Sequence, residues 1–254
     1  MAVDYPGKVE WVHMKVVSEC KNILMKARDQ ATRCLCYAKG VGEANNPVCI
    51  FHHIPKCGGT SIRYALKNWF SILNDSRYGY GEDILSPIKL KKLPPRCCVC
   101  GHFEVPGQGL FDRYPECMEG KQYPVFTFLR DPFEIKVSLF HYEQKRGLSV
   151  PDIETHMFDR KNYLADMLGI RTKDDISVIL DRYIFVGLVE QVQLSFDLLA
   201  KILGRGSVQV PVKNVTPRDV GTIKDYCFDK FVQENALDYA IYQYAQQRLS
   251  EENS

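Results

Sequence analysis

Four short apolar runs stand out along the chain: Val48 to Ile54, Arg96 to Phe103, Tyr123 to Leu129 and Tyr183 to Val189. Continuous apolar runs of this length are typical of strands that are buried on both faces of a parallel sheet. We therefore predict four parallel core strands. The polar stretch from Leu73 to Pro95, which carries several glycines and prolines, is expected to be a loop between core elements.

After three of these runs, apolar residues recur every three or four positions, a spacing that predicts helices packed by one face. The apolar positions are Ile62, Ala65, Leu66, Trp69 and Phe70 after the first run, Phe133, Val137 and Phe140 after the third, and a helix over 191–203 after the fourth. A closing helix is indicated by Leu237, Ala240, Ile241, Tyr244 and Ala245. Strands that alternate with helices predict an α/β fold, a three-layer sandwich whose central, mainly parallel sheet is flanked by helices.

The N-terminal region from Lys8 to Lys39 contains no glycine or proline, and its apolar residues also follow a helical spacing. This stripe consists of Val9, Val12, Val16, Cys20, Ile23 and Ala27. We expect residues 1–46 to form a helical extension, as one helix or two, that packs by this stripe on a single domain over 47–254. A homodimer through the same helix is the alternative.

Composition narrows the class of protein. A chain of 254 residues with 45% hydrophobic residues can bury one substantial core. Its formal net charge of only +2 argues against a nucleic-acid partner. The chain has no run of about 18 apolar residues, so we expect no membrane span. The N-terminal residues contain no apolar segment of a signal peptide, so we expect a cytoplasmic protein.

Ten cysteines are distributed over the chain, several of them within the predicted buried strands. Without a secretory signal they are expected to be reduced thiols that behave as small apolar side chains. Cys97 and Cys100 form a CxxC pair close to His102, which raises the question of zinc. No second pair with suitable spacing completes four ligands, so we predict no metal site.

The strongest chemical signal lies where the first predicted strand passes into its helix. Gly58 and Gly59 allow the backbone to turn its N–H groups inward. The hydroxyls of the next two residues add donors, and the positive end of the helix dipole points at the same place. These features predict a cradle for an anion, most plausibly phosphate. A Walker A loop is excluded because its lysine follows the glycines, whereas Lys56 precedes them. The candidate ligands are Lys56, Cys57, Gly58, Gly59, Thr60 and Ser61.

A second phosphate site is predicted after the third strand. Arg130 ends that strand, and the next helix begins with Asp131 as N-cap, Pro132 at its first position and Glu134 three residues after the cap, as in a capping box. Ser138 lies two turns along the same helix face as Asp131. An arginine and a serine placed in this way can share one phosphate.

The two segments together resemble the 5′-phosphosulfate loop and the 3′-phosphate site of sulfotransferases that use 3′-phosphoadenosine 5′-phosphosulfate (PAPS), especially the heparan sulfate-type carbohydrate branch. The likeness covers residues 48 to 220, including a segment at 213–218 that resembles the one closing over the nucleotide in relatives. It implies a P-loop-like fold and transfer of a sulfuryl group to a carbohydrate or small-molecule hydroxyl, which leaves adenosine 3′,5′-bisphosphate (PAP). Cys57 departs from the pattern, because the branch usually has threonine there.

The resemblance also assigns catalytic roles. The branch carries a Gly-His segment after its next core strand, which identifies His102 as the expected general base, with Glu104 as alternative or helper and Lys56 assisting the leaving group. Of His52 and His53, we expect one to face the site and the other the core. Cys57, at a helix N-terminus beside Lys56, is expected to be a reactive thiolate.

Two other classes of protein stay open. A P-loop kinase or NTPase needs the missing Walker lysine and a carboxylate for magnesium, for which Asp131 is the candidate, although its capping role already accounts for it. A catalytically silent module would keep the nucleotide cradle and use the N-terminal helix as an interaction arm.

Overall fold

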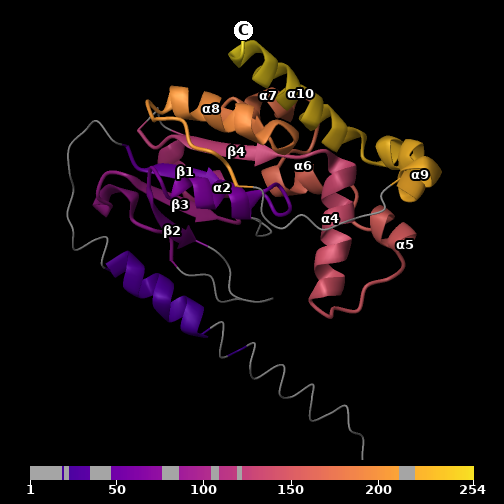
Figure 1. The fold of residues 1–254 in the computed structure, drawn as a ribbon, viewed down its shortest axis with the longest axis horizontal. Helices are drawn as coiled ribbons and strands as arrows, with labels where there is room; N and C mark the ends of the chain where they lie inside the picture. The colour runs from indigo at the N-terminus through magenta and orange to yellow at the C-terminus, as the bar shows by residue number, and fades with distance from the viewer. Residues whose placement is uncertain are drawn as a thin grey trace, which may run out of the picture.

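The computed structural model describes residues 19, 23–34, 47–75, 86–103, 109–118, 122–211 and 221–254. Its centre is a five-stranded sheet in the order β2-β3-β1-β4-β5, in which every neighbouring pair is parallel (Figure 1). The strands are β1 (Cys49–His52), β2 (Ser71–Asp75), β3 (Cys97–Gly101), β4 (Val125–Leu129) and β5 (Phe185–Leu188). The first strand of the chain is therefore the middle strand of the sheet.

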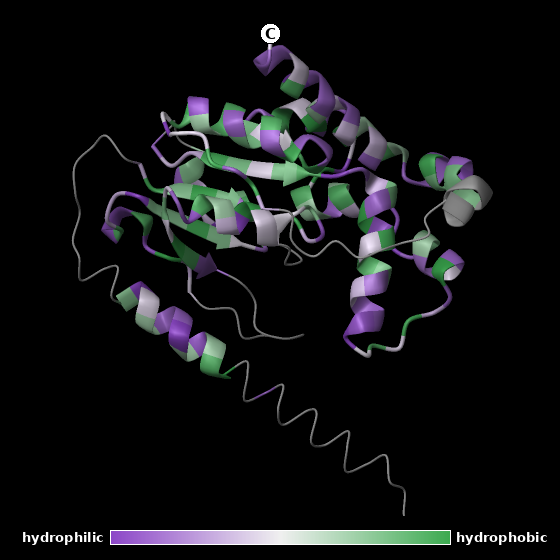
Figure 2. Cartoon of the chain, viewed as in Figure 1, coloured by the Kyte–Doolittle hydropathy of each residue, from purple (hydrophilic) through white to green (hydrophobic). Residues whose placement is uncertain are grey.

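The four predicted core strands are confirmed as β1, β3, β4 and β5, and every residue in them is buried. Figure 2 shows the hydrophobic colouring of these strands between helices of mixed polarity. The fifth strand, β2, corrects the expectation of a loop from Leu73 onward. Its sequence has few apolar residues and alternates in exposure because it lies at the sheet edge, and pairing with β3, from Ser71 opposite Cys97 to Asp75 opposite Gly101, makes it a strand.

Helices flank the sheet, which confirms the predicted α/β class (Figure 1). The cradle helix α2 follows β1, α4 follows β4, α8 follows β5, and α10 closes the chain, as expected. The bounds are α2 (Gly59–Leu66), α3 (Leu110–Arg113), α4 (Pro132–Lys145), α5 (Ile153–Phe158), α6 (Tyr163–Leu168), α7 (Asp175–Leu180), α8 (Val192–Ile202), α9 (Gly221–Glu234) and α10 (Ala236–Glu252), with 3₁₀ turns at Leu90–Lys92, Pro115–Cys117 and Val189–Gln191.

A further helix over residues 23–34 lies against the edge of the sheet, and polar side chains make its contacts. Arg33 forms an ion pair with Asp75 at 2.7 Å, and Asp29 accepts a hydrogen bond from Asn74 at 3.1 Å. Ile23 is 65% exposed and Ala27 is also exposed. The expectation that these two apolar residues pack on the domain is therefore wrong, because buried charge pairing rather than apolar burial orients this helix.

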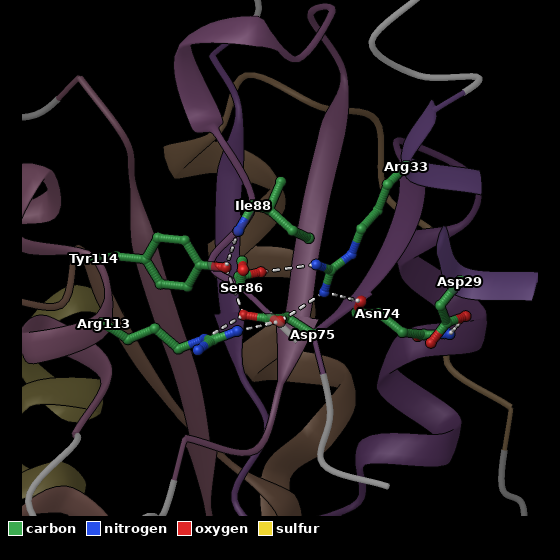
Figure 3. Close-up of polar contacts among 8 residues, drawn as sticks. All are labelled: Asp29, Arg33, Asn74, Asp75, Ser86, Ile88, Arg113 and Tyr114. Carbon is green, nitrogen blue, oxygen red and sulfur yellow. Dashed lines mark hydrogen bonds and ion pairs between the residues drawn. The ribbon is translucent and has the colours of Figure 1, made fainter. Parts of the chain in front are cut away.

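Asp75, at the end of β2, is the centre of the polar cluster that receives this helix (Figure 3). Its carboxylate accepts hydrogen bonds from Arg33, from two nitrogens of Arg113 at 2.7 and 2.8 Å, and from the Tyr114 hydroxyl. Burial raises the pKa of Tyr114, and the negative charge of Asp75 raises it further. The cluster joins the helix, β2 and α3. Tyr114 also packs edge-on against Phe103, so it supports the segment that follows β3.

Candidate active site

The predicted site segments meet at one edge of the sheet. Parallel strands end on the same side, and β3, β1 and β4 are adjacent. His102 follows β3, the loop with Lys56 follows β1, and Arg130 follows β4. In open α/β sheets, ligands bind outside the carboxyl ends of the strands where the chain order reverses, which here is around β1.

The loop after β1 leaves the first turn of α2 open to an anion. Lys56 and Gly58 both adopt left-handed backbone conformations, with φ of 66° and 68°. Gly58 is the N-cap of α2 and has no side chain with which to cap the helix, and the first turn contains no acidic residue. The Ser61 N–H donates to the Gly58 carbonyl at 3.0 Å, whereas the N–H groups of Gly59 and Thr60 precede the first bond of the helix, so this helix end suits phosphate or sulfate.

The two glycines of the loop serve different purposes. Gly58 supplies the left-handed turn, and a Cβ there would also lie 3.3 Å from Cγ2 of Val189. Gly59 has no such backbone requirement, but a Cβ on it would lie 1.6 Å from Nε2 of His53. Gly59 is therefore required by space, because the His53 ring rests directly on the first turn of α2.

Cys57 corrects one expectation. Its side chain is fully buried within the main hydrophobic core, and its N–H donates to the Ile54 carbonyl at 3.3 Å. Burial raises the pKa of the Cys57 thiol, and this effect outweighs the nearby Arg130 charge. The predicted reactive thiolate is therefore wrong. That Cys57 contributes to cofactor binding stays a prediction.

The consecutive histidines of β1 and its end point in opposite directions, as strand alternation predicts. His52 is buried, with Nδ1 2.8 Å from the Tyr183 hydroxyl. His53 contacts His102, with 4.3 Å between ring centroids and 34° between ring planes. Burial lowers the pKa of His53 well below its usual range, and the neighbouring basic side chains of His102 and Arg63 lower it further. Glu104 lies outside the described residues, as does the segment at 213–218.

The second predicted site is built around Arg130. Its guanidinium pairs with Glu134 at 3.0 Å and also lies 3.5 Å from the Lys56 carbonyl oxygen, so it links α4 to the β1–α2 loop. The predicted cap is confirmed, because Asp131 accepts from the Glu134 N–H at 3.1 Å. The reciprocal capping-box bond is absent from the described contacts. The Asp131 N–H donates instead to Glu190 at 3.0 Å, while Glu134 binds Arg130.

Helix α4 passes beyond the carboxyl ends of the strands (Figure 1), and its last turn contacts the cradle. The Lys56 ammonium lies 4.1 Å from the centre of the Tyr142 ring, and Arg146 donates to the Tyr142 hydroxyl at 2.9 Å. Ser138 is half-buried one turn before Tyr142, so it lies on the same helix face. Whether Ser138 and Arg130 share one phosphate stays a prediction.

Two residues and one contact near the site were not predicted from the sequence. Tyr142 carries a signal in hindsight, since it follows Ser138 by one helical turn. Glu190 follows β5 at the same edge of the sheet and accepts hydrogen bonds from Asp131 and from the Tyr242 hydroxyl, the latter at 2.9 Å. The contact of His53 with Gly59 has no sequence signal, because it depends on the distance between a strand end and a helix.

Among the described residues, no group of three or more histidines, cysteines or carboxylates is arranged to hold a metal ion. No helix in this part of the chain is long and apolar enough to cross a membrane. The cysteines that the structure describes are free thiols, and all but Cys34 are buried.

Two sulfotransferases are among the solved structures that are similar to this chain. One is a sulfotransferase from Alicyclobacillus acidocaldarius, with a TM-score of 0.50 and 15% sequence identity, covering 82% of this chain and 99% of that chain. The other is mouse sulfotransferase SULT7A1 complexed with PAP, with a TM-score of 0.46 and 14% identity, covering 85% of this chain and 94% of that chain. No protein-family model and no curated protein sequence matches. The bacterial structure shows that the chain has the α/β fold of a sulfotransferase.

Proposed function

We propose that this protein is a sulfotransferase, which moves a sulfuryl group from PAPS to a hydroxyl of a carbohydrate or a small molecule. The observation that carries the proposal is the open N-terminus of α2, with Lys56 in the same loop, next to His102 and Arg130 at the ends of the neighbouring strands. The fold shared with the bacterial sulfotransferase supports it. The order of Lys56 before the glycines favours a carbohydrate acceptor, as in the branch that the loop resembles.

The donor has two anionic ends, and the chain offers two places for them. The first-turn N–H groups of α2, the Thr60 and Ser61 hydroxyls and the Lys56 ammonium would hold the 5′-phosphosulfate. Arg130 and Ser138 would hold the 3′-phosphate. Glu134 and the Lys56 carbonyl orient the Arg130 guanidinium, which leaves part of its fork of N–H donors to meet a phosphate.

Sulfuryl transfer requires positioning and neutralisation of charge. The acceptor oxygen forms a bond to sulfur while the bond from sulfur to the bridging phosphate oxygen breaks, and PAP leaves. His102 would take the proton of the acceptor hydroxyl, a role typically worth about 10² to 10⁴ in rate. Lys56, whose ammonium lies over the Tyr142 ring, would neutralise the charge that develops on the leaving phosphate.

A screen of acceptors tests the proposal. Purified protein is incubated with sulfate-labelled PAPS and with fractionated carbohydrate and small-molecule extracts, and labelled products are counted. We expect transfer to at least one fraction and its loss in Lys56→Ala. Lys161→Ala is the matched control, because Lys161 pairs with Glu234 on the surface and is outside the proposed site. Transfer that persists at wild-type rate in Lys56→Ala would overturn the assignment of the cradle.

A further inference from the structure

A column of stacked rings runs from the core of the sheet to His102. Phe126 on β4 stacks on Phe51 of β1, with 5.5 Å between centroids and 11° between planes. Phe51 stacks on His53 at 5.6 Å and 20°, and His53 meets His102 at 4.3 Å and 34°. Both phenylalanines are fully buried, whereas the two histidines are half-buried. His53 is therefore the link between a rigid core and the ring of the proposed base.

The segment after β3 is held on both sides by the end of β1. On one side His52 packs against Phe103, with 5.3 Å between centroids, and both side chains are buried. On the other side His53 packs against His102. The His53 N–H also donates to the Gly101 carbonyl at 2.9 Å, which fixes the backbone between the two ring pairs. Two consecutive histidines thus hold two consecutive residues, of which only His102 faces the cradle side.

The His53 ring has little freedom to move away from this position. Its Nε2 edge occupies the space above Gly59, at the first turn of α2, and Phe51 lies behind it. Because the His53 ring is confined between a strand and a helix end, it holds a fixed position, and the His102 ring packs against it.

We propose that His53 is a positioning residue for His102, an inference that rests on the proposed function. Its ring, held between the core column and Gly59, sets the place from which His102 meets the acceptor hydroxyl. His53 itself acts through His102 and exchanges no proton with the acceptor.

The charges around His53 agree with this division of roles. Burial is the main reason that the pKa of His53 is lowered, and the neighbouring basic side chains of His102, Arg63, His52 and Lys56 act in the same direction. His53 therefore remains neutral while His102 carries the proton taken from the acceptor. A neutral His53 avoids the repulsion that two adjacent imidazolium ions would have.

Two substitutions test the proposal. His53→Ala removes the ring, and we expect kcat to fall about ten- to a hundredfold, because a misplaced base costs rate out of proportion to its displacement. PAP affinity, measured by calorimetry, should stay within about twofold of wild type, since the loss concerns placement rather than donor binding. His53→Phe keeps a flat ring in the column, and it should restore most of kcat. Turnover is followed as PAP formed from PAPS with the most active acceptor fraction.

A double-mutant cycle separates positioning from a general structural role. In a His102→Ala background, His53→Ala should have no further effect on kcat, because the residue that it positions is already absent. A fall in kcat that persists in that background, a loss of PAP affinity in His53→Ala, or failure of His53→Phe to restore kcat would each overturn the proposal.

An acceptor-free measurement distinguishes this inference from the proposed function. The ring proton resonances of His102 should shift when the neighbouring ring is removed in His53→Ala and should return toward the wild-type position in His53→Phe. Wild-type protein that binds no PAP would overturn the proposed function, and this inference with it. Wild-type binding and turnover with unchanged His102 resonances and unchanged kcat in His53→Ala would overturn the inference alone.

Discussion

The close contact between Gly59 and His53 makes a quantitative prediction about stability. In Gly59→Ala the new Cβ would begin 1.6 Å from His53 Nε2, so the ring or the start of α2 must move. Overpacking of this kind typically costs about 1–3 kcal/mol. The higher helix propensity of alanine offsets at most about 1 kcal/mol of this cost. We therefore expect Gly59→Ala to lower the free energy of unfolding by up to about 2 kcal/mol when the full gain in propensity is realised, or by up to roughly 8 °C in Tm for a chain of this size.

Denaturant unfolding of four proteins tests whether the His53 ring causes this loss: wild type, Gly59→Ala, His53→Ala and the double variant. Once His53 is alanine the clash is gone, so Gly59→Ala should then cost nothing or stabilise the protein slightly. Gly58→Ala is the matched control. Its penalty, about 1–2 kcal/mol from the left-handed backbone, should persist in the His53→Ala background because it does not depend on that ring. Equal penalties for Gly59→Ala with and without the His53 ring would refute the spatial explanation.

Three further predictions concern buried groups. Burial raises the pKa of Asp238 from 3.8 to about 6, so the stability that this group contributes is lost as the pH rises from about 4 to 6. Denaturant titrations of wild type and Asp238→Asn should show that the difference between their unfolding free energies changes by at most about 3 kcal/mol over that range. Arg33→Ala leaves the buried Asp75 carboxylate with fewer donors, so proteolysis within residues 23–34 should become faster, and unchanged rates would contradict the proposed docking. Cys57, being buried with a raised pKa, should resist alkylation in the native state; mass spectrometry showing rapid labelling of Cys57 would contradict this.

Features set by local sequence could be predicted, and features set by distant contacts could not. The buried strands, the Asp131 cap and the change from strand to helix at Gly58 follow from apolar runs, capping chemistry and backbone freedom within a few residues. The role of Glu190 could not be predicted, because this residue lies far along the chain and yet accepts the Asp131 N–H that a capping box assigns to Glu134. The edge strand β2 was missed for a similar reason, since its pairing with β3 outweighs its weak apolar pattern.

The site shows the same division. The resemblance places Lys56, His102 and Arg130 after strands, and the parallel sheet order then brings these strand ends together. The reactivity of Cys57 was predicted wrongly because the helix N-terminus and the neighbouring lysine can be identified in the sequence, whereas the burial of the Cys57 side chain cannot. The helix over 23–34 was expected to pack by its apolar stripe. Its buried contacts are Asp29 and Arg33, whose partners on β2 could not be identified without knowing that β2 is a strand.

The central claim is that the two phosphate sites together bind a nucleotide with a 3′-phosphate, and calorimetry with PAP, ADP and AMP in the absence of magnesium tests it most directly. We expect the wild-type protein to bind PAP roughly ten- to a hundredfold more tightly than ADP, since a charge-assisted contact to one phosphate is worth about 1.5–3 kcal/mol. Arg130→Ala should abolish most of this preference and Ser138→Ala part of it. Arg171→Ala, which removes an exposed arginine paired with Asp166, should leave it unchanged. Equal affinity of the wild-type protein for PAP and ADP would contradict the account and reduce Arg130 to an ion-pair partner of Glu134.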